Sequence, residues 1–362
     1  MKKKKILFLA NHFITLYSFR KELISEMVGL DHEVYLSLPE DKDNRYFEDI
    51  GCRIIPTKID RRGVNPLKDM QLIRFYRRMI PEVNPDIIFS YTIKPNIYGT
   101  LISNGKYKQV CNITGTGATF LNRNLVSIIC EMLYRVSIKR CYKVFFQNTG
   151  DRDFFIQHGL VKDNYAMLPG SGCNLKQHAF KPLPPTNHLN FIYIGRVMRL
   201  KGIDEYLACA KNIHEKYPNT SFYIAGWNEE PEYMSKVEEA QKAGFVEYIG
   251  FRKDIDLWIE RCHCTILASH GGEGVPNVLL ESAATGRICI ASDINGSHDV
   301  IEHEVTGYLF EKGNADALTR KVELFIGLSD EEKAAMGLAG RQKMEREFDR
   351  QIVVRKYLQE IL

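Results

Sequence analysis

The feature of the sequence that most constrains the fold is a regular alternation of short apolar runs with longer amphipathic stretches. Residues 18–30 and 65–80, for example, show helical spacing of apolar residues between two such runs. Strands that are apolar on both faces belong to buried parallel sheets, and helices between them form right-handed crossovers. The pattern therefore predicts the α/β class with doubly wound parallel sheets. The runs expected as strands are residues 5–10, 33–38, 53–57, 86–91, 109–114, 143–148, 165–169, 190–196, 221–227, 247–251, 264–269, 288–292 and 307–310.

The alternation stops once and then restarts. Residues 169–189 are rich in Pro, Gly and Asn, which is typical of a connection between domains. We expect a Rossmann-like domain at 1–170, a linker at 171–188, a second Rossmann-like domain at 189–348, and a closing helix at 349–362 that could pack back on the first domain. Ligands bind beyond the carboxyl ends of the strands in such sheets, so we expect the site in a cleft between the two facing domains.

Composition excludes several classes of protein. The chain has 362 residues, of which 44% are hydrophobic and 26% charged, as in ordinary globular proteins. No segment approaches the roughly 18 consecutive apolar residues that span a bilayer. The lysines at 2–5 precede an apolar run that is too short for a signal peptide. The first strand is followed by residues 11–19, which contain no glycine, and this argues against a nicotinamide or flavin enzyme.

Nine cysteines occur at irregular spacing, which predicts free buried thiols in a reducing, cytoplasmic compartment. Cys262 and Cys264 flank His263 and could suggest a metal site. No second pair of ligands has zinc-finger spacing, and strand alternation would put both thiols on one buried face. We therefore expect no metal.

The second half contains a pair of cations at a predicted strand–loop–helix junction. A strand ends at Gly195, Arg196 follows, and Lys201 comes just before the next helix. A guanidinium can bind two oxygens at once, an ammonium adds a point charge, and a helix N-terminus favours anions. The arrangement suits a diphosphate. The alternative is two solvated loop cations.

Residues 271–292 carry two glutamates eight positions apart in a strand, Gly-rich turn, Pro, helix and strand sequence. Glu273 lies ahead of the helix N-terminus, where it can reach a sugar beyond the phosphates, and Glu281 could reach a ribose. The alternatives are a partner of the helix dipole and a solvated residue on a surface helix. The turn and helix start expected to bind the donor are Gly274, Val275, Pro276, Asn277 and Val278.

These motifs together resemble the retaining glycosyltransferases of family 4, which have the GT-B fold of two facing Rossmann-like domains. The matching stretches of the second half are 195–202, 248–255, 273–301 and 306–310. Softer matches to acceptor domains of the bacterial polysaccharide branch occur at 16–23, 85–99 and 112–120. The resemblance thus covers nearly the whole chain.

The resemblance implies a role for each donor-side residue. Arg196 and Lys201 would neutralise the donor diphosphate, Glu273 would contact the transferred sugar and Glu281 the nucleotide ribose. Phe251 and Arg252 would border the nucleobase. No metal or other cofactor would be needed, and the anomeric configuration would be retained through front-face attack, so Glu273 need not be a nucleophile.

The acceptor side departs from the family pattern. Many relatives have a histidine near the end of the strand at 86–91, where this chain has Tyr91, Thr92 and Lys94. The loop after the first strand lacks the glycine pair common in the family and offers His12, which is more often a local hydrogen-bonding residue. The resemblance also places Tyr17, Gly115 and Gly117 on the acceptor side.

The resulting hypothesis is a UDP-sugar-dependent hexosyl- or N-acetylhexosaminyltransferase. Its acceptor would be a polyprenyl-diphosphate-linked or other oligosaccharide in capsule, O-antigen or exopolysaccharide assembly. A nucleotide-sugar 2-epimerase and a non-catalytic donor-binding subunit remain as alternatives. A cluster of basic residues suggests an anionic membrane surface as a partner, with a solvated helix face as the alternative and nucleic acid disfavoured. The cluster consists of Arg61, Arg62, Lys68, Arg74, Arg77 and Arg78.

Overall fold

The structure, a computed structural model, describes residues 2–60, 63, 65–115, 120 and 124–361. It consists of two compact units. The N-terminal unit comprises Met1–Ser171 together with Gln351–Leu362, and the C-terminal unit comprises Gly172–Arg350. The residues expected as a linker belong, from Gly172 onward, to the C-terminal unit. There the Lys181 N–H donates to the carbonyl of Thr285 at 3.1 Å. The final helix joins the N-terminal unit.

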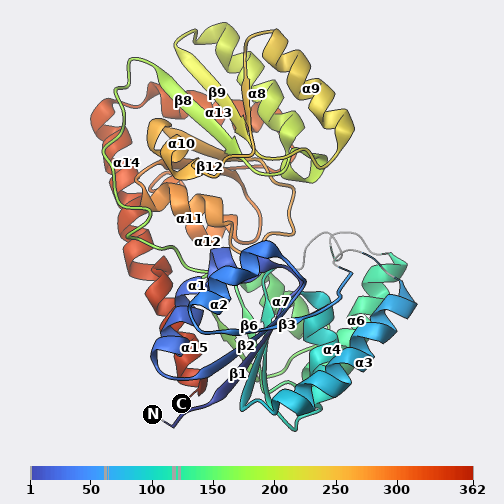
Figure 1. The fold of residues 1–362 in the computed structure, drawn as a ribbon. Helices are drawn as coiled ribbons and strands as arrows, with labels where there is room; N and C mark the ends of the chain where they lie inside the picture. The colour runs from blue at the N-terminus through green and yellow to red at the C-terminus, as the bar shows by residue number, and fades with distance from the viewer. Residues whose placement is uncertain (1, 61–62, 64, 116–119, 121–123, 362) are drawn as a thin grey trace. The chain divides into compact units, whose positions relative to one another are not determined.

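The described part of the N-terminal unit contains a seven-stranded parallel sheet in the order β3-β2-β1-β4-β5-β6-β7 (Figure 1). Its strands are β1 (Lys5–Leu9), β2 (Glu33–Leu38), β3 (Arg53–Pro56), β4 (Ile87–Tyr91), β5 (Lys108–Ile113), β6 (Lys143–Phe146) and β7 (Tyr165–Met167). Its helices are α1 (Phe13–Gly29), η1 (Lys42–Asn44), α2 (Arg45–Asp49), α3 (Pro66–Val83), α4 (Ile93–Ser103), α6 (Leu125–Ser137), η2 (Ile138–Arg140), α7 (Thr149–Gln157) and α15 (Arg350–Ile361). The strand order reverses between β1 and β4, which is where a doubly wound sheet binds ligands.

Both faces of this sheet are buried. Ile6 and Phe8 of β1 belong to one apolar cluster, whereas Leu7 and Leu9 belong to another. Helices α1 and α15 contribute to the first cluster, and α3, α4 and α6 contribute to the second. Helix α4 packs against both α3 and α6. Figure 1 shows these three helices together at one side of the unit.

The final helix packs in this core through Tyr357. Its hydroxyl donates to Asn112 Oδ1, and its ring lies 5.2 Å from the ring of Phe89, centroid to centroid. The guanidinium of Arg20, which is fully buried, lies 5.5 Å from the Tyr357 ring and 5.2 Å from the Tyr91 ring. Two aromatic faces thus stabilise a buried cation on the face covered by α1 and α15.

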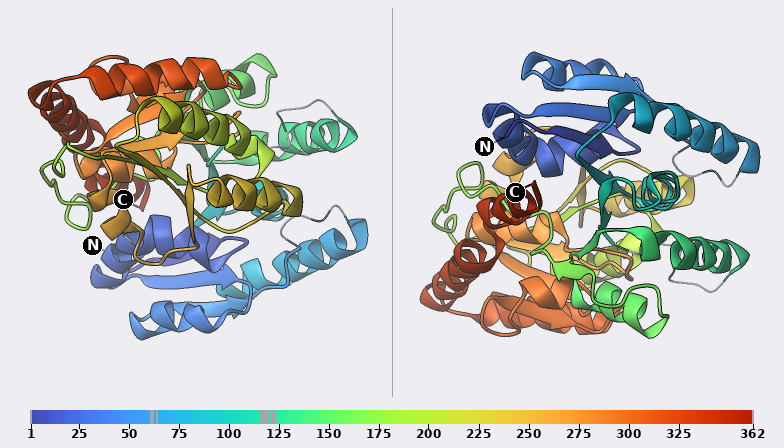
Figure 2. Two further views of the ribbon diagram at one scale, coloured as in Figure 1. Left: turned by 90° about the horizontal axis from the view of Figure 1, so that it is seen from above. Right: turned by 90° about the horizontal axis from the view of Figure 1, so that it is seen from below.

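The described part of the C-terminal unit contains a six-stranded parallel sheet in the order β10-β9-β8-β11-β12-β13. Its strands are β8 (Leu189–Ile194), β9 (Thr220–Ala225), β10 (Glu247–Gly250), β11 (Cys264–Leu267), β12 (Ile288–Ser292) and β13 (Gly307–Phe310). Its helices are η3 (Arg199–Lys201), α8 (Ile203–Lys216), α9 (Pro231–Lys242), α10 (Ile255–Arg261), α11 (Asn277–Ala284), α12 (Ser297–Val300), α13 (Ala315–Gly327), α14 (Asp330–Lys343) and a π-helical turn, η4 (Met344–Phe348). Figure 2 shows helices flanking the sheet. Its order reverses between β8 and β11.

Each apolar run expected as a strand forms one, with ends that differ from the prediction by a few residues, so the doubly wound α/β prediction is confirmed. Helix α1 begins at Phe13, five residues before the predicted start at 18, because His12 caps it. The His12 ring accepts a hydrogen bond from the Ile14 N–H at 3.1 Å. An imidazole here replaces the usual Ser, Asp or Asn cap, which is why the start was missed.

Candidate active site in the C-terminal unit

The predicted donor residues gather at the carboxyl ends of parallel strands. Arg196 follows β8, Phe251 follows β10, and Glu273 lies in the loop after β11. Because β8 and β11 are neighbours at the point where the strand order reverses, Arg196 and Glu273 lie at the position where doubly wound sheets bind ligands. Gly195, which was predicted to bind the donor, extends the pairing of β8 with β9. Its N–H donates to the carbonyl of Ala225 at 2.9 Å.

The loops after β8 and β11 are joined by close backbone contacts. Gly202 has a φ of +73°, and a Cβ at this position would collide with the carbonyl of Ala268. Ser269 Oγ and the His270 N–H both donate to the Leu200 carbonyl, at 3.2 and 2.9 Å. Only glycine permits this approach without strain, and the approach places η3 beside the loop that carries Glu273.

Lys201 and Glu273 form an ion pair in this loop contact. About 20% of the Lys201 side chain and 17% of the Glu273 side chain are exposed. Ser269 Oγ donates a further hydrogen bond to Glu273 at 3.0 Å. The sequence analysis gave these two residues separate tasks, at the diphosphate and at the sugar, and did not predict that they touch. Their separation by 72 residues hides the pairing from any local pattern.

Arg196 is also held by a carboxylate. Its guanidinium lies 3.6 Å from Glu229, and its carbonyl accepts a hydrogen bond from the Tyr193 hydroxyl at 2.6 Å. Trp227 Nε1 donates to the same carboxylate at 3.1 Å. Trp227 and Glu229 were not predicted as site residues, although Trp227 ends the predicted strand at 221–227 and Glu229 lies just after it. That position, at the carboxyl end of β9, was the available signal.

The predicted nucleobase border is aromatic and open. Phe251 is 60% exposed, and its ring centroid lies 5.6 Å from that of Trp227, itself 46% exposed. Arg252 donates two hydrogen bonds to Asp254, at 2.8 and 2.7 Å. The guanidinium is therefore compensated locally, whereas the two rings offer a surface on which a flat base could stack.

Helix α11 begins at Asn277. Pro276 is the N-cap and not a first-turn residue, and its carbonyl already accepts the Leu279 N–H at 3.1 Å. The N–H of Leu279 is therefore already paired and does not offer a further donor to a phosphate oxygen. Within the described chain, the N–H groups of Asn277 and Val278 have no backbone acceptor. They remain the α11 donors for an anion.

The turn before α11 is fixed by a second close approach. Gly296, with a φ of +86°, packs so tightly that a Cβ would collide with the carbonyl of Gly274 and come within 3.3 Å of Pro276 Cδ. Val275 is buried in the apolar cluster that also holds Leu279. The donor-binding turn predicted from 274–278 is thus packed on one side and joined to α11 on the other.

Glu281 is half-buried on α11 and is not a solvated surface residue. Burial and, to a smaller extent, the nearby carboxylate of Asp256 raise the pKa of Glu281 to about 7, while the Arg350 guanidinium opposes the shift. A carboxyl group that binds a proton near neutral pH can both donate and accept hydrogen bonds. That capacity suits a pair of vicinal hydroxyls.

The acceptor-side residues of the N-terminal unit have different environments. Tyr91 is 1% exposed and faces Arg20 in the core, so its prediction as an acceptor-side contact is wrong. Both faces of β4 are buried, which leaves a residue of this strand no open side. His12 caps α1, and the Tyr17 ring stacks on Phe13 at 5.0 Å.

The remaining acceptor-side candidates in the described chain, Lys94 and Gly115, follow β4 and β5. Lys94, on the first turn of α4, pairs with Asp69 at 2.6 Å and lines a cavity. Gly115 has a φ of +112° and lines a smaller cavity of about 190 Å³. Gly117 lies outside the described residues, as do Arg61 and Arg62 of the basic cluster.

The cysteines are free, and all except Cys130 are buried. Cys262 and Cys264 belong to different apolar clusters, so the prediction that they share one face is wrong. Cys262 caps α10 and precedes β11, which places it outside the strand alternation. His263 Nδ1 accepts the Asn190 N–H at 3.0 Å. In the described residues, no group of three or more His, Cys, Asp or Glu side chains could hold a metal ion, and no helix could cross a membrane.

The chain is similar in sequence to known glycosyltransferases. Residues 176–343 match the family "Glycosyl transferases group 1", and residues 5–148 match "Glycosyl transferase 4-like". Over 98% of the chain and 97% of the relative, the sequence is 25% identical to the N,N'-diacetylbacillosaminyl-diphospho-undecaprenol alpha-1,3-N-acetylgalactosaminyltransferase of Campylobacter jejuni. Over 71% of the chain and 70% of the relative, it is 23% identical to the UDP-Gal:alpha-D-GlcNAc-diphosphoundecaprenol alpha-1,3-galactosyltransferase of Escherichia coli.

The chain is also similar in fold to solved structures. Anabaena HepE, solved in complex with UDP and glucose, superimposes with a TM-score of 0.79 over 99% of both chains at 16% identity. The two family matches together cover most of the chain, and the paired α/β units have the GT-B fold. The chain therefore belongs to the GT4-type glycosyltransferases.

Proposed function

We propose that the protein transfers a hexose or N-acetylhexosamine from a UDP-sugar to a polyprenyl-diphosphate-linked saccharide, with retention of the anomeric configuration. The reaction would serve capsule, O-antigen or exopolysaccharide assembly. Two relatives named for diphospho-undecaprenol acceptors and α-linkages support the acceptor and the stereochemistry. The UDP in the name of the Escherichia coli relative and in the Anabaena complex supports the donor.

The observation that carries the proposal is the Lys201–Glu273 pair beside Arg196 at the reversal of the C-terminal sheet. Arg196, Lys201 and the free N–H groups of α11 would stabilise the negative charge that develops on the leaving diphosphate. Glu273 would contact the sugar and position Lys201. These cations and the helix N-terminus would take the place of a divalent metal, so EDTA should leave the rate within about twofold.

The chemical step breaks the bond between the sugar C1 and the diphosphate oxygen. The acceptor hydroxyl oxygen attacks C1 from the same face, and its proton passes to the departing phosphate oxygen. No covalent bond to Glu273 is required. In this scheme the protein contributes charge stabilisation and orientation, and these terms should appear mainly in kcat.

The test replaces each partner of the pair. A thermal-shift screen of UDP-, GDP- and ADP-sugars first identifies the donor, because a bound ligand raises stability. Lys201→Ala and Glu273→Ala should each lower kcat by about 10²–10³-fold, the usual effect of removing one transition-state charge contact. Lys216→Ala is the matched control, since Lys216 forms a 2.7 Å ion pair with Glu323 elsewhere in this unit. Wild-type rates for both variants would refute the proposal.

A further inference from the structure

The N-terminal unit contains an apolar cavity of about 630 Å³. It lies between α3, α4 and α6 and ends at the loops after β1 and β4. Eight of its 17 lining residues are large aliphatic side chains, and most of these come from α3, α4 and α6. These side chains are Ile59, Met70, Ile73, Ile93, Ile97, Val126, Ile129 and Leu133.

The polar lining includes Asp60 after β3, Asp69 on α3 and Tyr98 on α4, and three further residues lie where the strand order reverses. Asn11 follows β1, and Thr92 and Lys94 follow β4. Thr92 has a φ of +71°, which is strained for a β-branched residue, and strain of this kind concentrates at functional sites. Its buried hydroxyl has no hydrogen-bond partner in the part of the chain that the structure describes. The cavity is therefore amphiphilic, with one polar end and long apolar walls.

The apolar walls continue onto the surface along α6. Six large apolar residues of this helix are exposed, from 37% for Val126 to 73% for Leu125, and five of them recur at helical spacing. We call these five the α6 strip: Leu125, Ile128, Ile129, Met132 and Val136. Ile129 belongs both to the strip and to the cavity wall, so the two surfaces are continuous.

Basic side chains lie on the same two helices. Arg74, Arg77 and Arg78 are exposed on α3, and Lys139 and Arg140 are exposed just after α6. Apolar residues flanked by Lys and Arg are typical of surfaces that lie in the boundary of an anionic bilayer.

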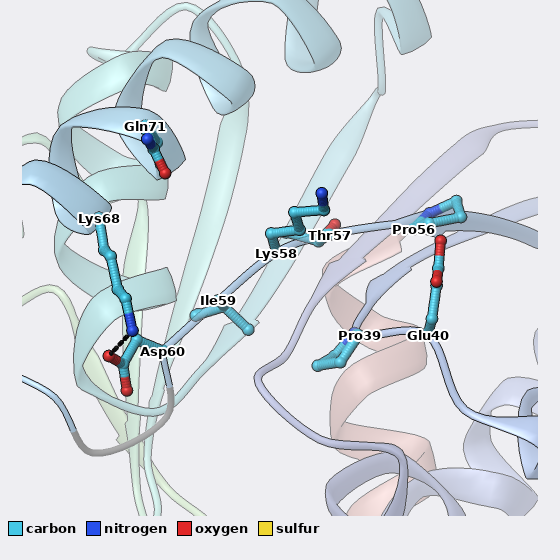
Figure 3. A pocket seen from close by; sticks show the side chains of 9 residues that line it. All are labelled: Pro39, Glu40, Pro56, Thr57, Lys58, Ile59, Asp60, Lys68 and Gln71. Carbon is cyan, nitrogen blue, oxygen red and sulfur yellow. Dashed lines mark hydrogen bonds and ion pairs between the residues drawn. The ribbon is translucent and has the colours of Figure 1, made fainter.

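A second hollow shows that this apolar character is local. It has a volume of about 590 Å³ and shares Ile59 and Asp60 with the apolar cavity, but Glu40, Lys58 and Lys68 also line it (Figure 3). Lys68 pairs with Asp60 at 3.0 Å, as the dashed line shows. Two neighbouring hollows of similar size thus differ in chemistry.

The geometry points to the apolar cavity as the binding site for the isoprenoid chain of the acceptor, and this inference rests on the proposed function. The phosphate end of the lipid lies at Thr92 and Lys94, and the hydrocarbon runs between α3 and α6. The α6 strip lies in the bilayer boundary, so the chain can pass between bilayer and cavity without crossing water. Cavity and strip together make the N-terminal unit selective for a lipid-borne acceptor.

Cys130 provides a direct probe because it is the half-buried thiol of the described chain and lines the cavity. Farnesyl diphosphate should slow alkylation of Cys130 by N-ethylmaleimide at least 10-fold, and inorganic diphosphate should not. Cys130→Ser removes the labelled site and identifies the signal. Equal protection by inorganic diphosphate would overturn the inference. Equal protection by dodecyl phosphate would overturn the isoprenoid assignment.

Two neighbouring isoleucines of the α6 strip form a matched pair of variants. Ile129 lines the cavity and Ile128 does not, and both side chains are exposed, so an aspartate at either position should not prevent folding. Ile129→Asp should weaken farnesyl diphosphate binding at least 10-fold, whereas Ile128→Asp should change it less than twofold. Equal effects would assign the binding to the surface alone and refute the cavity.

The two proposals fail in different ways. Sugar transfer onto a water-soluble acceptor analogue depends on the donor site and needs no isoprenoid chain in the cavity. A protein that transfers sugar but gives no farnesyl protection of Cys130 refutes the lipid cavity alone. A protein that turns over no UDP-sugar with any acceptor refutes the proposed function.

Discussion

The two units have the same doubly wound topology, but they differ in the loops at the point where the strand order reverses. In the C-terminal unit, the loops after β8 and β11 are drawn together by glycine and carry the Lys201–Glu273 pair with Arg196 nearby. In the N-terminal unit, the loops after β1 and β4 stand at the polar end of an aliphatic cavity. The sheet fixes where a ligand binds, and the loops fix whether the site suits a charged nucleotide or a lipid.

The largest expected effect tests how the final helix stabilises the N-terminal unit. Tyr357→Ala removes a buried ring that contacts Phe89 and Arg20, so it should cost about 3–5 kcal/mol of unfolding free energy. Both tryptophans, Trp227 and Trp258, belong to the C-terminal unit. The urea midpoint by far-UV circular dichroism should therefore fall more than the midpoint by tryptophan fluorescence. The exposed Arg355→Ala is the control, and a loss below 1 kcal/mol for Tyr357→Ala would contradict the account.

The next effect compares a glycine from each unit. Gly202→Ala forces a Cβ into the Ala268 carbonyl at a positive φ, which should cost about 3 kcal/mol and displace Lys201 from Glu273. Gly105 has a similar φ of +75°, but a Cβ there meets no described atom within 4 Å. Gly105→Ala should cost only about 1 kcal/mol, the left-handed backbone penalty. Equal losses in urea unfolding would show that the loop contact contributes nothing.

Glu281 makes the unfolding free energy of the C-terminal unit depend on pH. Its pKa is about 7 in the folded chain against an ordinary 4.5, so the unfolded chain releases a proton that the folded chain keeps. The unfolding free energy therefore falls as pH rises from about 4.5 to about 7, by up to about 3 kcal/mol. Glu281→Gln cannot ionise, and its stability relative to wild type should rise between pH 5 and pH 8, as followed by tryptophan fluorescence. The same difference at both pH values would contradict the shift.

The smallest effect concerns the open aromatic pair. Trp227→Ala and Phe251→Ala should each weaken donor binding by about 1–3 kcal/mol, the usual contribution of a ring stacked on a base, with little loss of stability because both rings are exposed. Titration with the identified nucleotide measures the loss. Leu324→Ala, at a residue that is also half exposed in this unit, is the control. Unchanged affinity in both aromatic variants would exclude these rings from the base site.

The strands could be predicted because apolar runs such as 288–292 are buried on both faces, and this pattern is local. Tyr91, at the end of the predicted strand at 86–91, is buried in the same way. The donor residues could be placed because Arg196 and Phe251 lie at the carboxyl ends of predicted strands and Glu273 lies in the loop after one. The pairing of Lys201 with Glu273 depends on the approach of two loops, which no local pattern encodes. The apolar cavity likewise depends on three helices meeting.

The central claim is that the donor site transfers a sugar to an acceptor with retention. The most direct measurement follows a panel of UDP-hexoses and UDP-N-acetylhexosamines by proton NMR, with and without a polyprenyl-diphosphate-linked saccharide. We predict that UDP and an α-linked product form together only when the acceptor is present. A C2-inverted sugar formed from the donor alone would indicate a 2-epimerase, and binding without any turnover would indicate a non-catalytic subunit. Either result would contradict the account.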